Sequence, residues 1–328
     1  MSNNKTQNKI AQPVMPKKTY NFCGKRRIKV IITAVVIVPA TPALLIRGVN
    51  VAIEFKGGTV ITYDYSGEMD TSKAESVVKE ITGTSVSVRT GENIESNGTQ
   101  ITVSFTSEDG LTADRQTEVT DALQEAFPDS SIVLSESNDV SPSTGKEFFL
   151  KCIVAVIFAA VLIIIYIALR FRKIGGWAAG LCSVLALLHD LVVAFASSVI
   201  LGFEFNSNTV AVILTILGYS INNTIVIYDR IRENRQLMPK APMNEVINLG
   251  CSQSLRRSVR TSITTIGAML IITIVVLISG YDSLLSFSVP LLFGLLSGLY
   301  SSLFVAPVTW SWWIEKRAAK AEKSKDKK

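Results

Sequence analysis

The stretch CIVAVIFAAVLIIIYIAL, residues 152–169, decides the class of fold. It carries no charged residue and is long enough to cross the hydrocarbon core of a bilayer as a helix. Arg170, Arg172 and Lys173 follow it directly. Basic residues next to a membrane span mark its cytoplasmic end. The sequence therefore predicts a membrane-spanning helix that ends in the cytoplasm.

Similar apolar runs lie on both sides of this stretch, and 48% of the whole chain is hydrophobic. A first apolar run begins after a polar N-terminus, and Pro39 and Pro42 interrupt it without a clear cleavage site, so we expect it to be retained. We predict a multi-pass α-helical membrane protein with six transmembrane helices, over residues 28–46, 150–169, 175–201, 208–228, 261–279 and 284–313.

Residues 50–145 form a segment of a different kind. They hold 17 acidic and only 5 basic residues. Apolar positions suit an amphipathic helix over 71–82 and another near residues 119–127. Alternating residues suit short strands near 85–90, 100–105 and 132–134, and β-rich flanks surround Gly57 and Gly58. The order β-α-β-β-α-β predicts a ferredoxin-like α+β domain between the first two spans.

The charge distribution predicts the topology. The N-terminal segment 1–27, the linker 229–260 and the tail 314–328 are rich in basic residues, which remain on the cytoplasmic side of a membrane. Six spans place both termini on that side and the acidic domain outside. We therefore expect a multi-pass membrane protein with both termini in the cytoplasm. The basic residues flank apolar runs, which favours a lipid contact over nucleic acid.

Several polar residues lie inside the predicted spans, where charge is costly. His189 and Asp190 lie in the third span, and either a relay role or a satisfied interior pair accounts for them. Tyr219, Ser220 and Asn223 share one face of the fourth span. That face must pack inward, and hydrogen bonds between helices explain it as well as a functional role does.

Basic residues precede the fifth span at Arg256, Arg257 and Arg260, as positive-inside anchors or, for one of them, as a group reaching toward the polar face. The chain has a single histidine, and we predict no catalytic constellation, no metal site and no cofactor. The spacing of Gly294 and Gly298 is typical of close helix packing.

Five strings together resemble the SecD/SecF family of the RND superfamily: GVNVAIEFKGGT (48–59), LLHDLVVAF (187–195), ILTILGYSINNTIVIYDRIREN (213–234), QSLRRSVRTSITT (253–265) and GLLSGLYSSLFVAP (294–307). The signature positions include Gly57, Gly58, Asp229 and Arg230. The resemblance, which is to SecF members, covers residues 21–314. It implies half of an RND-type bundle, with SecD as the other half.

The resemblance also implies a location, the cytoplasmic membrane of a bacterium, and a function. Family members act with the SecYEG channel, the SecA motor and a translocating preprotein, and use the gradient of protons, or in some cases sodium, to complete export. One residue departs from the pattern: the family usually has a titrating carboxylate where this chain has Asn223, while its partner arginine corresponds to Arg257. The SecD half then carries the only such carboxylate, or Asp190 replaces it, or this half is mainly structural.

Two other functions stay open on the sequence. A homodimeric RND-type exporter of small solutes needs two six-helix halves, which two copies of this chain supply. A membrane enzyme or protease is the third alternative, and the lack of nucleophile and ligand constellations argues against it.

Overall fold

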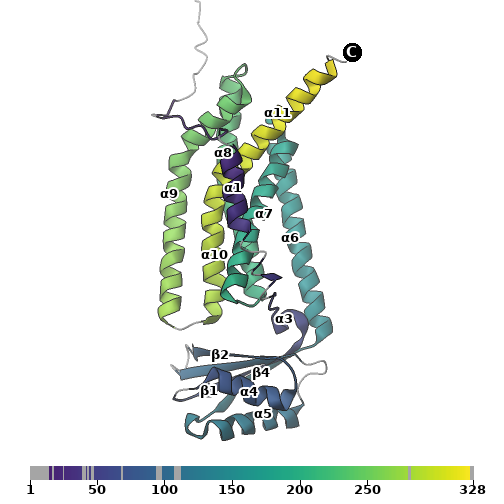
Figure 1. Ribbon diagram of the computed structural model, residues 1–328, viewed down its shortest axis with the longest axis vertical. Helices are drawn as coiled ribbons and strands as arrows, with labels where there is room; N and C mark the ends of the chain where they lie inside the picture. The colour runs from purple at the N-terminus through teal and green to yellow at the C-terminus, as the bar shows by residue number, and fades with distance from the viewer. Residues whose placement is uncertain are drawn as a thin grey trace, which may run out of the picture.

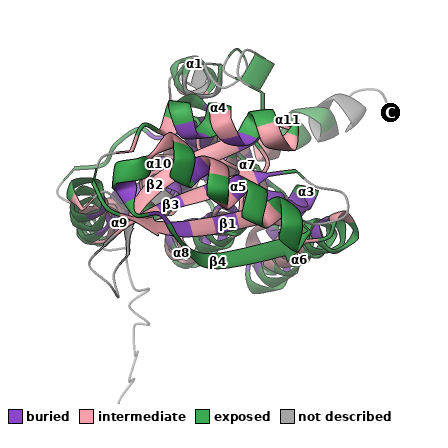
Figure 2. Cartoon of the chain, turned by 90° about the horizontal axis from the view of Figure 1, so that it is seen from below, coloured by how far each residue is buried: buried purple, intermediate pink, exposed green. Residues whose placement is uncertain are grey.

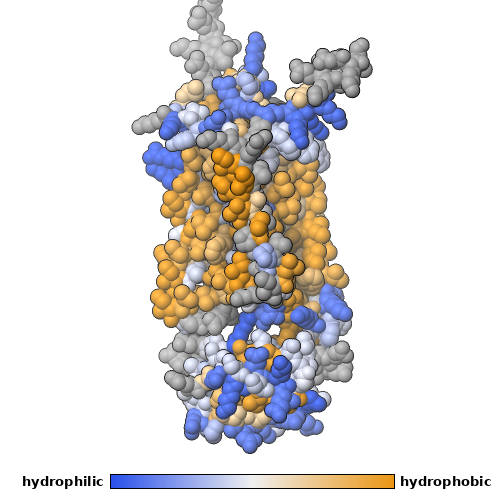
Figure 3. All heavy atoms as spheres, in the orientation of Figure 1, coloured by the Kyte–Doolittle hydropathy of each residue, from blue (hydrophilic) through white to orange (hydrophobic). Residues whose placement is uncertain are grey.

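The computed structural model describes residues 15–16, 18–24, 26–38, 42, 44–45, 48–67, 69–93, 98–106, 112–279 and 282–325. It consists of a long helix bundle with a small α/β module at one end (Figure 1). The other end of the bundle, where α6 ends at Arg170 and α8 ends at Leu237, is called the distal end below. On the face seen in Figure 3, hydrophobic side chains cover the helices between the module and the hydrophilic distal end.

The helices of the bundle are long and apolar. Within the described residues, five helical segments have the length and composition to cross a membrane, and the last of them, Leu284–Lys320, combines three consecutive elements. In chain order the bundle contains α1 (Arg26–Ile37), α6 (Pro142–Arg170), η2 (Arg172–Ile174), α7 (Gly176–Leu201), α8 (Ser207–Leu237), α9 (Met243–Ile278), α10 (Asp282–Tyr300), the π-helix η3 (Ser301–Val305) and α11 (Ala306–Lys325).

The first predicted span, residues 28–46, is described only in part. Helix α1 has 12 residues, which at about 1.5 Å per residue is too short to cross the hydrocarbon core. Most of residues 39–47 lie outside the described part of the chain. A sixth span therefore stays a prediction.

Two segments differ from the expected boundaries. Residues 229–260 do not form a separate linker, because α8 continues to Leu237 and α9 already begins at Met243. With 36 residues, α9 is about 54 Å long, which is more than the bilayer core needs. The last span is not one regular helix, since the π-helix Ser301–Val305 separates α10 from α11.

Helix α8 lies on the opposite side of the bundle from α1, with α9 and α6 at its two sides (Figure 2). It packs against α10, α9, α7 and α6. Helices α6 and α9 leave many large apolar side chains exposed, among them Phe158 and Ile271. An exposed apolar surface of this extent suits contact with lipid.

The module has the element order β-α-β-β-α-β, as the periodicity of this segment predicted. It contains β1 (Gly58–Tyr65), α4 (Thr71–Thr82), β2 (Val86–Asn93), β3 (Gly98–Phe105), α5 (Ala113–Ala126), the short 3-10 helix η1 (Pro128–Ser130) and β4 (Val133–Val140). The strands pair antiparallel in the order β2-β3-β1-β4, with Ile61 opposite Val103. Helices α4 and α5 cover the face of the sheet that points away from the bundle (Figure 1).

Gly57 and Gly58 let the chain at the start of β1 lie close to the backbone of Pro142 and Phe105. Gly57 has a φ of 85°, and a Cβ atom there would lie 2.5 Å from the backbone of Pro142. A Cβ atom on Gly58 would lie 2.3 Å from the carbonyl oxygen of Phe105. The chain before the pair is not a strand as expected but the short helix α3 (Ile53–Lys56).

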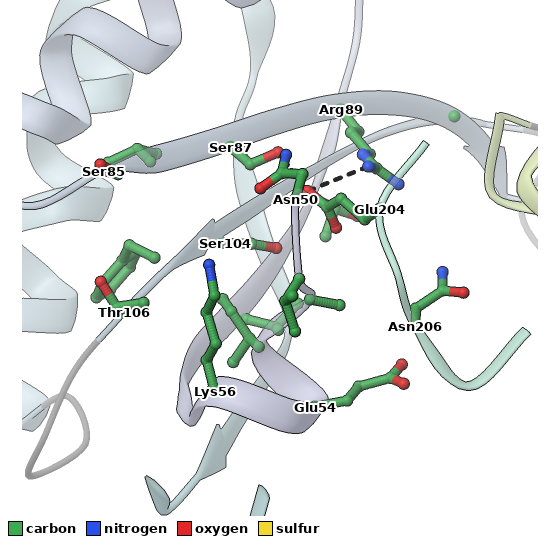
Figure 4. Close-up of a pocket in the computed structure, with 18 of the residues that line it drawn as sticks. Asn50, Glu54, Lys56, Ser85, Ser87, Arg89, Ser104, Thr106, Glu204 and Asn206 are labelled. Atoms are coloured by element: carbon green, nitrogen blue, oxygen red, sulfur yellow. Dashed lines mark hydrogen bonds and ion pairs between the residues drawn. The ribbon is translucent and has the colours of Figure 1, made fainter. Parts of the chain in front are cut away.

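Contacts between the module and the bundle gather at the loop from α7 to α8. The ring of Phe55 lies 5.4 Å from that of Phe148 and 5.6 Å from that of Phe205. Arg89 of β2 forms an ion pair of 3.1 Å with Glu204 of this loop (Figure 4). The ion pair lies at a cleft of about 490 Å³ between the sheet and the bundle, and most of the residues that line this cleft are polar.

Candidate functional site

A fully buried carboxylate, Asp190, lies in α7. Its Oδ1 accepts a hydrogen bond from Ser297 at 2.6 Å and lies 3.2 Å from His189 Nδ1. Its Oδ2 accepts from Ser220 at 2.7 Å and from Ser301 at 2.6 Å. A carboxylate away from water is costly unless donors surround it. Here each oxygen has two polar neighbours, so the group is held firmly in place.

The three serines come from different elements, which meet around Asp190. Ser220 belongs to α8, Ser297 to α10, and Ser301 opens the π-helix η3. A Cβ atom on Gly298 would lie 3.3 Å from the Cβ atom of Ser220, which is tighter than an ordinary contact, so the glycine lets α10 approach α8 beside Asp190. Isolated π-helical turns are frequent at functional sites. The irregular turn therefore marks the point where the last helix meets the buried charge.

His189 shares this environment. It is only 5% exposed, and its Nδ1 lies 3.2 Å from both Asp190 and Ser297. Its Nε2 has no hydrogen-bond partner within the described part of the chain. The imidazole ring lies 6.0 Å from the ring of Tyr300, whose hydroxyl donates to the carbonyl of Lys29 in α1. The site is thus linked to the first helix.

The polar face of α8 divides between two neighbours. Ser220 turns to Asp190, whereas Tyr219 donates a hydrogen bond of 3.2 Å to Ser262 of α9. Asn223 is 4% exposed, and its Nδ2 finds no acceptor among the described residues. A buried amide without an acceptor costs about 1–3 kcal/mol. Asn223 is therefore the least satisfied group of this face.

Arg257 lies apart from Asp190. It is exposed, and it lines an open cavity of about 640 Å³ at the distal end together with Asp229 and Arg230. Within the described part of the chain, no hydrogen bond or ion pair joins Arg257 to Asp190 or to Asn223. The structure thus brings His189, Asp190 and Ser220 together and places the predicted arginine elsewhere.

Sequence reasoning missed Ser297 and Ser301 as partners of Asp190. The signal was present, because residues four apart lie on one face of a helix and Gly294 and Gly298 follow the same spacing. Serine is common in membrane helices, however, and nothing in the pattern says which serines face a carboxylate.

The site combines a carboxylate, an imidazole and three serine hydroxyls in one buried hydrogen-bond network. Among the described residues no group of three or more His, Cys, Asp or Glu side chains could hold a metal ion. The matching family model is described as protein export membrane protein SecD/SecF, C-terminal, and it matches residues 118–316. The chain belongs to the SecD/SecF family. The matched region includes Asp190 and all three serines.

Relatives across bacteria support this membership in the SecD/SecF family. Protein translocase subunit SecF of Pseudomonas aeruginosa is 30% identical over 90% of this chain and 91% of its own length. Its namesake from Rickettsia bellii is 34% identical over 79% of this chain and 82% of its own length. The one from Rhodothermus marinus is 29% identical over 94% of this chain and 96% of its own length.

Solved structures of SecDF share the fold. The structure of SecDF from Thermus thermophilus, described as a translocon-associated membrane protein, has a TM-score of 0.75 and 28% identity over 91% of this chain. A SecDF structure in the super-membrane-facing form has a TM-score of 0.66 and 29% identity over 95% of this chain. The chain spans about two fifths of these SecDF chains, 39% and 41%.

Proposed function

We propose that the chain is an accessory subunit of the Sec preprotein translocase and acts with SecD to complete export on the transmembrane ion gradient. The SecYEG channel, SecA and the translocating preprotein are its further partners in this proposal. The observation that carries it is the buried Asp190 with its four polar neighbours, in a chain whose relatives are translocase subunits. A charge in the bilayer is a functional hypothesis by default.

Pairing with SecD agrees with the open face of α8. Four positions along this face are exposed although they lie in an apolar helix: Ala211, Thr215, Gly218 and Asn222. A Cβ atom on Gly218 would meet nothing within 4 Å. Small and polar side chains let helices approach closely in a membrane. We assign this face to the SecD half, which the longer SecDF chains contain beside a region similar to this chain.

The topology in this proposal places the distal end in the cytoplasm. Both termini then lie in the cytoplasm, and the acid-rich module with the ferredoxin-like element order lies outside, where an emerging preprotein can meet it. The basic residues at the distal end and the acidic module support this orientation.

Asn223 cannot titrate, so ion coupling must use other groups. We favour a carboxylate of the SecD half as the group that faces Arg257, with Asp190 as the buried charge of this half. Export that depends on the proton gradient, measured with Asn223→Asp and Arg257→Ala variants, tests this face. No change in either variant would remove Tyr219, Asn223 and Arg257 from the mechanism.

The decisive experiment compares Asp190→Asn with the wild type in cells whose own SecF is depleted. Loss of preprotein export at normal membrane levels of the chain supports the proposal. Full export with Asp190→Asn would show that the carboxylate is structural only.

A homodimeric exporter of small solutes is the alternative, because two copies also make two RND-type halves. Purification from native membranes separates the two functions. A SecD-like chain that copurifies in equal amount favours the translocase. A homodimer without such a partner favours the exporter.

A further inference from the structure

An irregular stretch before the first helix lies buried at the distal end. Residues 20–24, called the strap below, form neither helix nor strand and lead into α1 (Figure 1). Phe22 is only 3% exposed and Cys23 only 6%. Irregular segments usually run over the surface of a protein, because their backbone groups need hydrogen-bond partners. A buried strap must therefore be held by specific contacts.

Helix α9 supplies these partners from the part that precedes its predicted span. The backbone N–H of Tyr20 donates to the hydroxyl of Ser252 at 2.9 Å, and that of Cys23 donates to Asn248 Oδ1 at 2.8 Å. The two side chains lie one helical turn apart, and the hydroxyl of Ser252 in turn donates to the carbonyl of Asn248 at 2.7 Å. The strap thus has a fixed position on α9, and its backbone makes the attachment.

The side chain of Phe22 points the other way, into the bundle, where it meets the π-helix η3. Its ring lies 5.4 Å from the ring of Phe304. The ring of Phe304 stacks at 5.4 Å on that of Tyr300, which lies 6.0 Å from His189. Three ring contacts therefore lead from the strap to the residue next to Asp190.

The π-helix η3 is held from two sides. Ser301 at its start donates to Asp190 Oδ2 at 2.6 Å, while Phe304 near its end packs against Phe22. Tyr300, directly before the turn, is held by α1, because its hydroxyl donates to the carbonyl of Lys29 at 3.2 Å. A π-helical turn is a rare backbone form that is often found at functional sites. Removing the contact on the side of the strap should therefore loosen the turn that supplies a donor to the buried carboxylate.

We propose that Phe22 is a positioning residue for the buried site: it fixes η3 through Phe304, so that Ser301 stays against Asp190 and Tyr300 stays beside His189. The strap then belongs to the site, although it lies at the distal end and precedes the first helix. This inference rests on the proposed function only for its effect on export.

The test measures hydrogen–deuterium exchange of backbone amides by peptide mass spectrometry on the purified full chain in nanodiscs. Phe22→Ala should speed exchange of residues 300–305 about tenfold, the upper end of what one aromatic pair contributes. The amides of α6 and of the module should keep their wild-type rates. Phe22→Leu keeps an apolar side chain but no ring, so it should give a smaller rise, and it replaces Phe22→Ala if that variant does not fold.

Tyr20→Ala is the matched control. It removes an aromatic ring from the same strap, but that ring is 45% exposed, and the backbone N–H that donates to Ser252 remains. Exchange of η3 should stay at the wild-type rate in this control. Wild-type exchange of η3 in the Phe22 variants, or an equal rise along every helix, would overturn the proposal.

A double-mutant cycle tests whether the effect passes through Phe304. Phe22→Leu and Phe304→Leu remove the same ring contact, so the double variant should exchange in η3 little faster than the faster single variant. Multiplied effects of the two substitutions on the exchange rate would mean independent contributions to packing and would overturn the positioning role.

Export separates this inference from the proposed function. Phe22→Leu should lower preprotein export at normal membrane levels of the chain, and Tyr20→Ala should not. Full export with Phe22→Leu in cells where Asp190→Asn blocks export would overturn the positioning role. Full export with Asp190→Asn would instead count against the proposed function, while the exchange of η3 in the Phe22 variants still decides whether the strap positions the turn.

Discussion

Replacing Asp190 separates the charge of this residue from its role as a hydrogen-bond acceptor. Asparagine keeps an acceptor and adds donors that serine hydroxyls can rotate to meet, so Asp190→Asn should unfold at nearly the wild-type temperature. Asp190→Ala leaves Ser220, Ser297 and Ser301 without their acceptor. Each orphaned polar group costs about 1–3 kcal/mol. Thermal unfolding of the purified chain in detergent should therefore place Asp190→Ala far below Asp190→Asn, and equal temperatures would contradict the network.

Gly58 provides a second prediction at this scale. A side chain there would meet the carbonyl oxygen of Phe105 at 2.3 Å, and the φ of 145° is strained for any residue with a Cβ atom. Gly58→Ala should lower the free energy of unfolding by about 1–3 kcal/mol. Gly91→Ala is the control, because nothing lies within 4 Å of a Cβ atom at that position of β2. Proteolysis of the module should be faster in Gly58→Ala than in Gly91→Ala. Equal rates in the two variants would contradict this expectation.

The sequence identified some of these residues and not others, for a physical reason. Asp190 was identifiable because a carboxylate in an apolar run is costly and rare. Ser297 and Ser301 were not, because a serine hydroxyl in a membrane helix can also donate to a carbonyl of its own helix. For Arg257 the sequence left two roles open, a positive-inside anchor or a partner of the polar face of α8, and in the structure this residue lines the distal cavity. A long side chain can point in several directions from one backbone position, and spacing alone does not choose between them.

At the scale of elements, the loop between α7 and α8 connects the module to the buried site. Glu204 on this loop is held by Arg89 at 3.1 Å and by the hydroxyl of Ser87 at 3.0 Å. The same loop joins the helices that carry Asp190 and Ser220. A movement of the module therefore has a direct mechanical route to these two helices.

Reversing the charges of this ion pair tests that route. Arg89→Glu places two acids together and should loosen the module, while Arg89→Glu with Glu204→Arg should restore the contact. The pair is partly exposed, so its stability contribution is small, about 0.2–1 kcal/mol. The readout is therefore protease cleavage of the chain between module and bundle. If the single and double variants are cleaved at the same rate, the ion pair does not hold the module.

The sequence patterns predicted which segments are helices and strands better than they predicted where these elements end. A long uninterrupted apolar run fits a membrane-spanning helix. The apolar periodicity of residues 71–82 fits a helix that buries one face. The sequence patterns did not predict that α8 and α9 extend beyond the bilayer core. Polar helical turns outside the lipid have the same composition as a loop. The π-helix at Ser301–Val305 leaves no mark in hydrophobicity, since every residue in it is as apolar or small as its neighbours.

For the whole molecule, the distribution of hydropathy and charge along the sequence was enough to predict the fold class. The same distribution does not indicate pairing with a second RND-type half, because a surface that faces lipid and a surface that faces another helix are both apolar. In our proposal the exposed small and polar positions of α8 distinguish the two surfaces, and exposure is a property of the folded bundle.

Orientation in the membrane is the prediction that depends on the whole chain. Ser135→Cys places a thiol on the exposed strand β4, and Ala318→Cys places one on the exposed part of α11. A thiol reagent that does not cross membranes should label the first in intact cells stripped of their outer barrier and leave the second unlabelled until the membrane is opened. The unsubstituted chain, with its four cysteines, is the control. Labelling of Ala318→Cys from outside would place the basic distal end on the wrong side. The charge argument for the topology and the position of the module toward emerging preproteins would then both fail, because the acidic module and the basic end lie at opposite ends of one continuous bundle (Figure 1).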